Sequence, residues 1–422
     1  MSILLTNATY IDWQSLAFTK THILVEEGKN GTIKYIDDIS LFPDCQVIDC
    51  TGKYVTRSFA VGHHHAYSAM AKGMPSPKKN PENFYEILQY VWWNLDKNLT
   101  RESVEYSALI TAMACAKAGS TFVIDHHASP NFISGSLELM ATAFEKVGIG
   151  HLLCYEITDR DGKEKAQQGM DETAEYLHNY QALVGLHASF TVGNDTLKKA
   201  VSLANQFSTG IHIHVAEDLY DQTHCEKNYN KRVIQRLAEA GAMESSKSLL
   251  VHCLHLDENE RHLIESSPVW TVQNAESNMN NNVGYFNGAG LGERIMLGTD
   301  GMHSDILQSA KSAFFVGQRY DNITYPSSYQ RFRNTHHYLQ TNHFAGDGDN
   351  NLVVLDYDSG TEFNQENFLG HFIFGIKSEH VHDVISQGKL IVKNRMIQTV
   401  NEAEILKESR KLATGLWDRM RK

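Results

Sequence analysis

The middle of the chain, from about residue 54 to 344, alternates short apolar runs with stretches in which apolar residues recur at helical spacing. Thr100 begins one such helix: it is an N-cap residue followed by acidic Glu102, and the helical pattern ends at Gly119. Residues 120–125 follow at once and read as a buried strand. Strands that alternate with helices in this way indicate a parallel sheet.

Both ends of the chain have a different texture, with short apolar runs separated by Gly, Asn and Asp turns. These runs predict strands at 3–11, 22–28, 32–36 and 46–49, and again at 351–357, 371–375 and 389–393. The pattern as a whole predicts an α/β fold: a (β/α)₈ TIM-like barrel, with a small β-sandwich formed from the N- and C-terminal segments. The predicted divisions are 1–55, 56–344 and 345–422.

Composition narrows the class of protein. The 422 residues are 42% hydrophobic and 21% charged, as in ordinary globular proteins, and the net charge of −12 argues against nucleic-acid binding. No run of 18 apolar residues and no signal-peptide pattern is present, so we expect no membrane span and a cytoplasmic location. The six scattered cysteines are expected to be reduced.

Histidines stand where several predicted strands end. In His63-His64-His65, the first and third side chains of an extended backbone point to the same side, so His63 and His65 can bind one metal ion while His64 points away. His214 ends another apolar run, and Glu217 follows where the chain begins to turn and can reach a metal-bound water.

Three further positions complete this pattern. His252 is a candidate ligand or a substrate-facing base, whereas His212 fits the core and His255 fits a supporting or structural place. Asp300 ends an apolar run between glycines that leave room for a substrate. Carboxyl ends of parallel strands meet at one mouth of a barrel, so these groups predict one Zn²⁺ or Fe²⁺ site in a metal-dependent hydrolase.

The chain resembles the amidohydrolase superfamily, in the branch of guanine, cytosine, chlorotriazine and S-adenosylhomocysteine deaminases, with SsnA-type aminohydrolases the most similar. The segments that carry the resemblance span nearly the whole chain: 62–74 (GHHHAYSAMAKGM), 91–97, 124–130, 154–160, 185–191, 212–217, 276–281 and 297–305.

The resemblance implies roles for these residues. Metal would be held by His63, His65, His214 and Asp300. Glu217, His252 and Asp300 would be catalytic, moving protons as a metal-activated water attacks an amino-substituted ring carbon and ammonia leaves. His187 would face the substrate. Residues 182–187 carry no lysine of the kind that bridges two metals in other members, so one ion is expected, Zn²⁺ first and Fe²⁺ as the alternative.

The chain also departs from the family pattern on the substrate side. Arg57-Ser58 replaces Pro-Gly, and Val61 stands where Asn is common. Lys72 replaces a frequent arginine, and Gln273 replaces the usual histidine; both are predicted to contact the substrate.

An aromatic segment after the first barrel strand, with Phe84, Tyr85, Trp92 and Trp93, predicts a lid that stacks on a flat ring, with Trp92 as a substrate contact. The alternative is that these aromatic side chains only pack a helix on the barrel.

The leading hypothesis is a metal-dependent aminohydrolase acting on a small amino-substituted N-heterocycle. The alternatives are hydrolysis of another C–N or C–Cl bond, and an inactive scaffold homologue, which only Gln273 favours. A small-molecule substrate is the expected partner, without nucleic acid or membrane, and the family implies a homo-oligomer, a dimer first.

Overall fold

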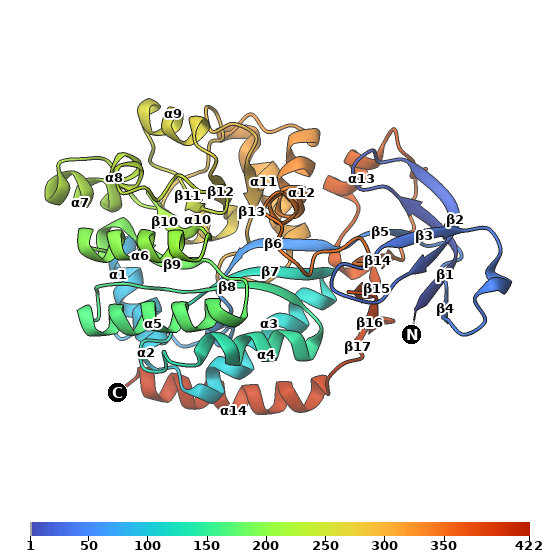
Figure 1. The fold of residues 1–422 in the computed structure, drawn as a ribbon, viewed down its shortest axis with the longest axis horizontal. Helices are drawn as coiled ribbons and strands as arrows, with labels where there is room; N and C mark the ends of the chain where they lie inside the picture. The colour runs from blue at the N-terminus through green and yellow to red at the C-terminus, as the bar shows by residue number, and fades with distance from the viewer. Residues whose placement is uncertain (1) are drawn as a thin grey trace.

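The computed structural model describes residues 2–422, and two parallel sheets lie at its centre (Figure 1). One has the strand order β6-β7-β8 and the other β13-β12-β11-β10-β9. Their bounds are β6 (Phe59–His64), β7 (Ser120–His127), β8 (Gly150–Tyr155), β9 (Val184–Ala188), β10 (Ile211–Val215), β11 (Leu249–His252), β12 (Trp270–Gln273) and β13 (Ile295–Leu297). The predicted α/β fold with parallel strands is confirmed.

Isolated parallel bridges connect the two sheets at both of their edges. Leu153 pairs with Ala182, and Ile157 with Leu186, beside β8 and β9. At the other edge His64, the last residue of β6, pairs with Asp300 just after β13. The carboxyl ends of β6 and β13 therefore lie side by side.

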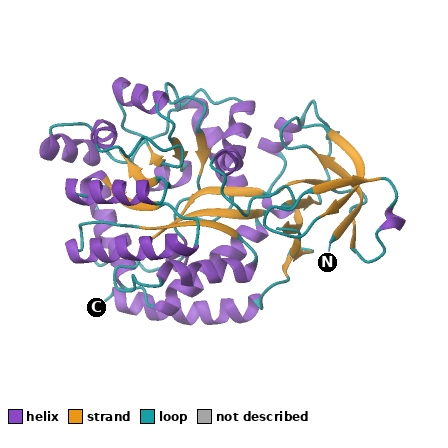
Figure 2. Cartoon of the chain, viewed as in Figure 1, coloured by secondary structure: helices purple, strands orange, loops and turns teal. Residues whose placement is uncertain are grey.

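Helices cover the outside of these sheets (Figure 2). The connections hold α3 (Arg101–Lys117), α4 (Ser136–Val147), α5 (Lys163–Asn179), η4 (Ser189–Thr191), α6 (Asn194–Gln206), α7 (Leu219–Tyr229), α8 (Val233–Glu239), α9 (Glu258–Ser266), α10 (Ala275–Asn281), α11 (Ile306–Tyr320) and α12 (Tyr325–Thr341). The helix predicted after Thr100 is α3, and the Thr100 side chain accepts a hydrogen bond from the backbone N–H of Ser103. The strand predicted after it is β7.

The connection from β6 to α3 is built from short helical pieces: η2 (Ala66–Ala71), α1 (Phe84–Ile87), the π-helical turn η3 (Leu88–Trp92) and α2 (Trp93–Lys97). π-Helical turns are rare and are frequent at functional sites. Here the turn brings Leu88 and Trp92 to the pocket described below.

The two ends of the chain share one nine-stranded sheet, at the right of Figure 1. Its strands are β1 (Ile3–Ile11), β2 (Phe18–Val25), β3 (Ile33–Ile36), β4 (Gln46–Asp49), β5 (Tyr54–Arg57), β14 (Leu352–Leu355), β15 (Val381–Ser386), β16 (Lys389–Lys393) and β17 (Met396–Ile397); η1 (Ile39–Leu41) and η5 (Ser378–His380) lie in its connections. β5 and β14 pair antiparallel and join the two segments. A two-layer sandwich stays a prediction, as do the division points; the change of sheet falls at Ser58, between β5 and β6.

The strand predicted at 371–375 is wrong, because this segment belongs to helix α13 (Phe368–Phe374). Its apolar run is too short to separate the two periods, and Phe368, Phe372 and Ile373 are buried at helical spacing. Phe372 packs on Phe332 of α12, with ring centroids 5.0 Å apart. On its other edge from β5, β14 pairs antiparallel with β15, a strand that the sequence pattern did not predict.

The chain then runs into α14 (Glu402–Met420), which packs along α3 at the bottom of Figure 1. Among the described residues, no helix combines the length and apolar surface needed to cross a membrane.

Candidate metal centre and pocket

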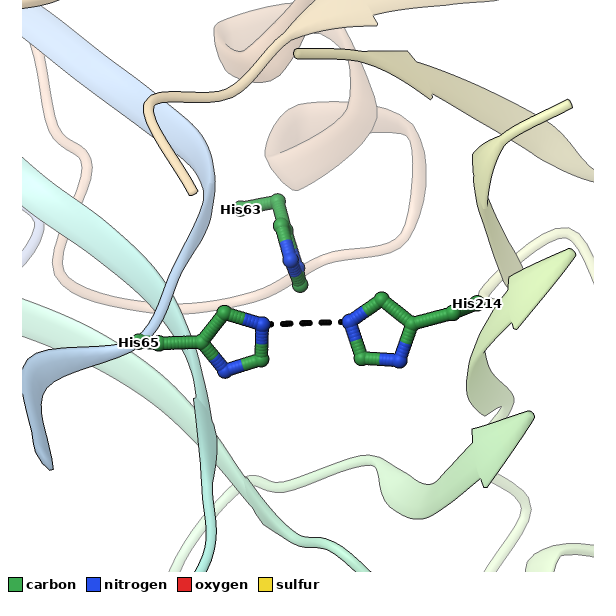
Figure 3. Close-up of side chains that lie close together, drawn as sticks. All are labelled: His63, His65 and His214. Atoms are coloured by element: carbon green, nitrogen blue, oxygen red, sulfur yellow. Dashed lines mark hydrogen bonds between the residues drawn. The ribbon is translucent and has the colours of Figure 1, made fainter. Parts of the chain in front are cut away.

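Three histidine rings from two strands meet at the carboxyl ends of the parallel strands (Figure 3). His63 and His65 come from the end of β6, and His214 from β10. One nitrogen of each ring lies within 4.8 Å of the others, and the Nε2 atoms of His65 and His214 are 3.1 Å apart. His64 points away, as predicted, with its Nε2 2.7 Å from Ser304 Oγ.

The other nitrogen of each ring is held from behind. His65 Nδ1 lies 2.7 Å from the backbone oxygen of His126, and His214 Nδ1 lies 2.7 Å from that of His187. Because a carbonyl can only accept, each Nδ1 carries a hydrogen, so in the neutral ring the lone pair that can bind a metal is on Nε2. His63 Nδ1 contacts His212 Nε2 at 2.9 Å, so His212 is a buried support as well as a core residue.

Carboxylates complete the group. Asp300 Oδ1 lies 3.2 Å from His65 Nε2 and 3.6 Å from His63 Nε2. Glu217, His252 and Asp300 form a second set whose ligand atoms are also within 4.8 Å of one another. His252 Nε2 lies 3.4 Å from Glu217 Oε2 and 3.8 Å from Asp300 Oδ2.

Burial and neighbouring charges set the protonation of these groups. Burial lowers the pKa of His63 and of His252 to about 4, and holds the pKa of His214 well below its ordinary value. Burial acts on His65 in the same direction, but the hydrogen bond and charge of Asp300 outweigh it and raise the His65 pKa to about 9. The site therefore stabilises a positive charge beside Asp300.

The two carboxyl groups differ. Burial, together with the charge of Asp300, raises the pKa of Glu217 well above its ordinary value. Burial would also raise the pKa of Asp300, but the adjacent rings of His63 and His65 hold it well below the usual range. Asp300 is thus the anion of the pair, while Glu217 is able to carry a proton.

The backbone is bent sharply where two of these residues stand. His252 has φ of 73° and Asp300 has φ of 49°, in the left-handed region that residues other than glycine seldom adopt. Such conformations are unfavourable by about 1–3 kcal/mol each and persist where the surroundings enforce them. For Asp300, the enforcing contact is the hydrogen bond from its N–H to the His63 carbonyl, at 3.2 Å.

The residues present fit a divalent cation. His63 Nε2 is buried and has no hydrogen-bond partner, which is costly unless a ligand takes its lone pair. Neutral imidazole nitrogens with one carboxylate are a ligand set that suits Zn²⁺ or Fe²⁺. The group His63, His65, His214 and Asp300 offers this set at one point.

A pocket opens directly on this group, with about 630 Å³ of empty space including its open mouth. It is lined by His65, Tyr67, Ser68, Phe84, Leu88, Trp92, Trp93, Glu156, Arg160, His187, His214, Glu217, His252, Ser277, Asn280, Asn281, Asp300, Gly301 and Met302. The predicted contacts His187 and Trp92 are among them, and so are Phe84 and Trp93. Tyr85 instead packs edge-on against Trp93 and at a tilt against Tyr220.

Two predicted substrate contacts lie elsewhere. Lys72 is exposed at the end of η2, and it is not among the pocket-lining residues. Gln273 is buried, and its Oε1 accepts a hydrogen bond of 2.9 Å from Arg331, which pairs in turn with Asp321. The structure does not bring Lys72 or Gln273 to the pocket, because one turns to solvent and the other is engaged in this ion network.

Sequence reasoning missed several residues at the site, although their segments had been noted as similar to the family. Asn278 Nδ2 lies 2.8 Å from His252 Nδ1, and Asn281 Nδ2 lies 3.4 Å from Glu217 Oε1. Glu156 and Arg160 follow β8 and line the pocket. Glu156 comes directly after β8, so its place at a strand end was visible in the sequence. Arg160 lies further along the connection after β8, and Asn278 and Asn281 lie within α10, so the strand-end rule does not single them out.

A pocket at the carboxyl ends of parallel strands, with a histidine–aspartate cation site at its base, defines a metal-dependent hydrolase of α/β fold. The model of the amidohydrolase family matches residues 59–330, more than half of the chain. The chain belongs to the amidohydrolase family.

The similarity to other proteins extends over nearly the whole chain. A 5-methylthioadenosine/S-adenosylhomocysteine deaminase of Syntrophomonas wolfei is 24% identical in an alignment 406 positions long that covers 88% of each chain. An adenosine deaminase from Xanthomonas campestris with bound zinc has a TM-score of 0.82 at 17% identity, over 99% of this chain and 98% of that one. An atrazine chlorohydrolase from Arthrobacter aurescens complexed with zinc has a TM-score of 0.82 at 13% identity, over 97% and 100%.

Proposed function

We propose that this protein is a metal-dependent aminohydrolase that removes an amino group from a small N-heterocycle and releases ammonia. One observation carries the proposal: the three ring nitrogens and the Asp300 carboxylate converge at the base of a pocket, with Glu217 beside them. The similarity to an adenosine-type deaminase of S. wolfei supports this choice of reaction. The bridges between the sheet edges support the further proposal that β6–β13 form one closed eight-stranded barrel.

We assign a single Zn²⁺ ion, with Fe²⁺ as the alternative, to His63, His65, His214 and Asp300. An ion of this kind supplies a water that is acidic enough to act as a nucleophile near neutral pH. Residues 182–187 of the neighbouring strand hold no lysine that could bridge a second ion.

The chain's own groups then handle the protons. Glu217 lines the pocket and takes one proton from the attacking water, which it delivers to the departing nitrogen. The ring carbon gains an oxygen as the C–N bond breaks, and ammonia leaves. His252, 3.4 Å from Glu217 and held from behind by Asn278, orients the water and the carboxyl groups. The aromatic side chains of Trp92, Trp93 and Phe84 provide faces on which a flat ring can stack.

The test is ammonia release by the zinc-loaded protein over a panel of aminopurines, aminopyrimidines, pterins and aminotriazines, with chloride release from a chlorotriazine measured alongside. His214→Ala should lose both metal and activity, whereas Glu217→Gln should keep the metal and lose activity. His262→Ala, at an exposed position, is the matched control and should change neither.

Equal metal content in the wild type and in His214→Ala would overturn the assigned site. Chloride release without ammonia release would indicate hydrolysis of a C–Cl bond. Full occupancy by metal with no product released from any compound would favour an inactive scaffold. A cytoplasmic location and a dimeric state stay predictions, to be checked by fractionation and by light scattering.

A further inference from the structure

We call His63, His65, His214 and Asp300 the metal-ligand group. A second group of charged side chains lies beside it in the pocket wall. Glu156 follows β8, is 4% exposed and lines the pocket. Its carboxylate has two charged or ionisable neighbours, Arg160 Nη2 at 3.4 Å from Oε1 and His126 Nδ1 at 3.6 Å from Oε2. Neither contact has hydrogen-bond geometry, and within residues 2–422 no side chain or backbone group donates a hydrogen bond to Glu156 Oε1 or Oε2.

Arg160 is fixed by other partners. Its Nη2 pairs with Asp96, its Nε lies 3.2 Å from Asp161 Oδ2, and its guanidinium lies over the ring of Trp93 at 5.2 Å. The Arg160 side chain is only 6% exposed. Arg160 therefore keeps a positive charge beside Glu156 without supplying the hydrogen bonds that a buried carboxylate requires.

A buried carboxylate without a donor is unfavourable, and this cost is removed when a ligand donates a hydrogen bond to it. His126 places Glu156 near the reacting end of the pocket, because its ring centroid is 5.4 Å from that of His65. Trp93, which also lines the pocket, adds an aromatic surface on the same side. A planar ligand that binds against this wall therefore needs a hydrogen-bond donor on its edge to complement Glu156.

We propose that Glu156 accepts a hydrogen bond from an N–H of the substrate ring, with Arg160 as its positioning residue, so that the substrate is a heterocycle carrying an N–H besides the amino group it loses. This inference rests on the proposed function and narrows its substrate class. Rings with a lactam N–H next to an amino-bearing carbon, such as guanine or isocytosine, have this edge.

The substrate class differs from that of the adenosine-type relatives. Once its amino group is counted as the leaving group, an adenine ring substituted at N9 offers only acceptor nitrogens, and Glu156 would face them without a shared hydrogen. Sugar hydroxyls are the other donors that a nucleoside could offer to a carboxylate, so they have to be an arm of the test.

The experiment measures binding by calorimetry to the zinc-loaded Glu217→Gln protein, which should not turn the ligands over. Two matched pairs isolate the lactam edge: guanine against 2-aminopurine, and isocytosine against 2-aminopyrimidine. Adenosine tests the sugar hydroxyls. We expect the lactam member of at least one pair to bind about 10- to 100-fold more tightly, as for a hydrogen bond to a charged group.

Adding Glu156→Gln should reduce that preference to less than about threefold, because the neutral amide is a weaker acceptor and can also donate to an acceptor edge. Asp161→Asn is the matched control: it removes the same charge from the same cluster, but Asp161 does not line the pocket, so the preference should remain.

A preference that Glu156→Gln leaves unchanged overturns the inference, and so does Glu156-dependent binding of adenosine above both lactam rings, or binding of none of the five ligands. Ammonia release by the wild type is recorded in parallel. Ammonia release without a Glu156-dependent preference refutes this inference alone. A Glu156-dependent preference without ammonia release refutes the proposed function and leaves the recognition edge standing.

Discussion

Two buried groups of histidines and charged residues lie at opposite ends of β6, and they serve different purposes. At the carboxyl end, the metal-ligand group leaves His63 Nε2 without a partner and opens on a pocket. At the amino end, Arg57 Nη2 contacts Asp347 Oδ2 at 3.1 Å, and His336 Nδ1 contacts the same oxygen at 2.8 Å. We call Arg57, His336 and Asp347 the junction cluster, since it ties β5 and β6 to α12 and the segment after it.

The difference shows what to look for in a buried polar group. In the junction cluster the Asp347 carboxylate pairs directly with the Arg57 guanidinium and contacts His336, and these three residues are absent from the pocket lining. At the metal-ligand group, the carboxyl groups of Asp300 and Glu217 stand close together, and His63 Nε2 is buried without a partner. A buried charge that is paired with an opposite one stabilises a fold, whereas ionisable groups that crowd together at a pocket and leave a nitrogen without a partner indicate a ligand.

The largest effect is expected at the carboxyl end of β6, where a substitution should change activity but not stability. Glu217→Gln should lower kcat by about 10³-fold or more, within the range of general acid–base catalysis, while zinc content and the melting temperature hold. Asp218→Asn is its control, because Asp218 caps α7 and asparagine caps equally well. Steady-state kinetics and metal analysis check both, and a loss of stability in Glu217→Gln would mean that this end is structural too.

The next effect is expected at the junction cluster, on stability alone. Asp347→Asn leaves Arg57 without its buried counter-charge and should lower the free energy of unfolding by about 3–5 kcal/mol. Asp349→Asn removes the other, 60%-exposed partner of Arg57 and should cost less than about 1 kcal/mol. Urea unfolding measures both, and equal losses would contradict the role of burial.

A smaller effect should come from the support of His252. Asn278→Ala should reduce kcat by about 10- to 100-fold at unchanged zinc content, since a ring that loses its supporting contact is less well oriented. The pH profile of kcat should shift with it. Met279→Ala, at a 40%-exposed position on the same helix and outside the pocket lining, should leave that profile in place, and a profile unmoved by Asn278→Ala would remove this role.

The smallest effect is a loss of stability at low pH. Burial lowers the pKa of His336 to about 4, so between pH 6.5 and 4 the unfolded chain binds a proton that the folded protein does not. The stability that the folded protein gains by keeping His336 neutral is therefore present above pH 6.5 and is lost as the pH falls. The loss is about 1 kcal/mol at pH 5.5. Urea unfolding at pH 7.5 and 5.5 should show a smaller decrease for His336→Gln than for the wild type, and an identical decrease would refute the assignment.

The sequence predicts the parallel strands and the metal end well, because both follow a short-range rule. A side chain capable of chemistry stands at the carboxyl end of a buried strand or just after it: His63 and His214 are the next-to-last residues of β6 and β10, and Asp300 follows β13. What it could not predict depends on distant partners. Gln273, the last residue of β12, was expected to contact the substrate because it stands where the family usually has histidine, and only the fold shows that Arg331 engages it.

Phe372 illustrates the same limit for secondary structure. Its apolar segment fits a strand or a helix equally well, and the aromatic surface of α12, far away in the sequence, decides for the helix. Glu156 was overlooked because its meaning lies in a missing contact, which no sequence pattern records.

The order of strands in the nine-stranded sheet has a consequence for synthesis on the ribosome. β5 lies between β1 and β14, so the N-terminal strands can pair among themselves early, but one edge of β5 stays open until β14 emerges. Nearly three hundred residues separate them: Arg57 and Asp347 are 290 apart. At about 5–20 residues per second, that edge waits on the order of 15–60 seconds. An open strand edge is a template for pairing with other chains, so the nascent protein should depend on chaperones during this interval.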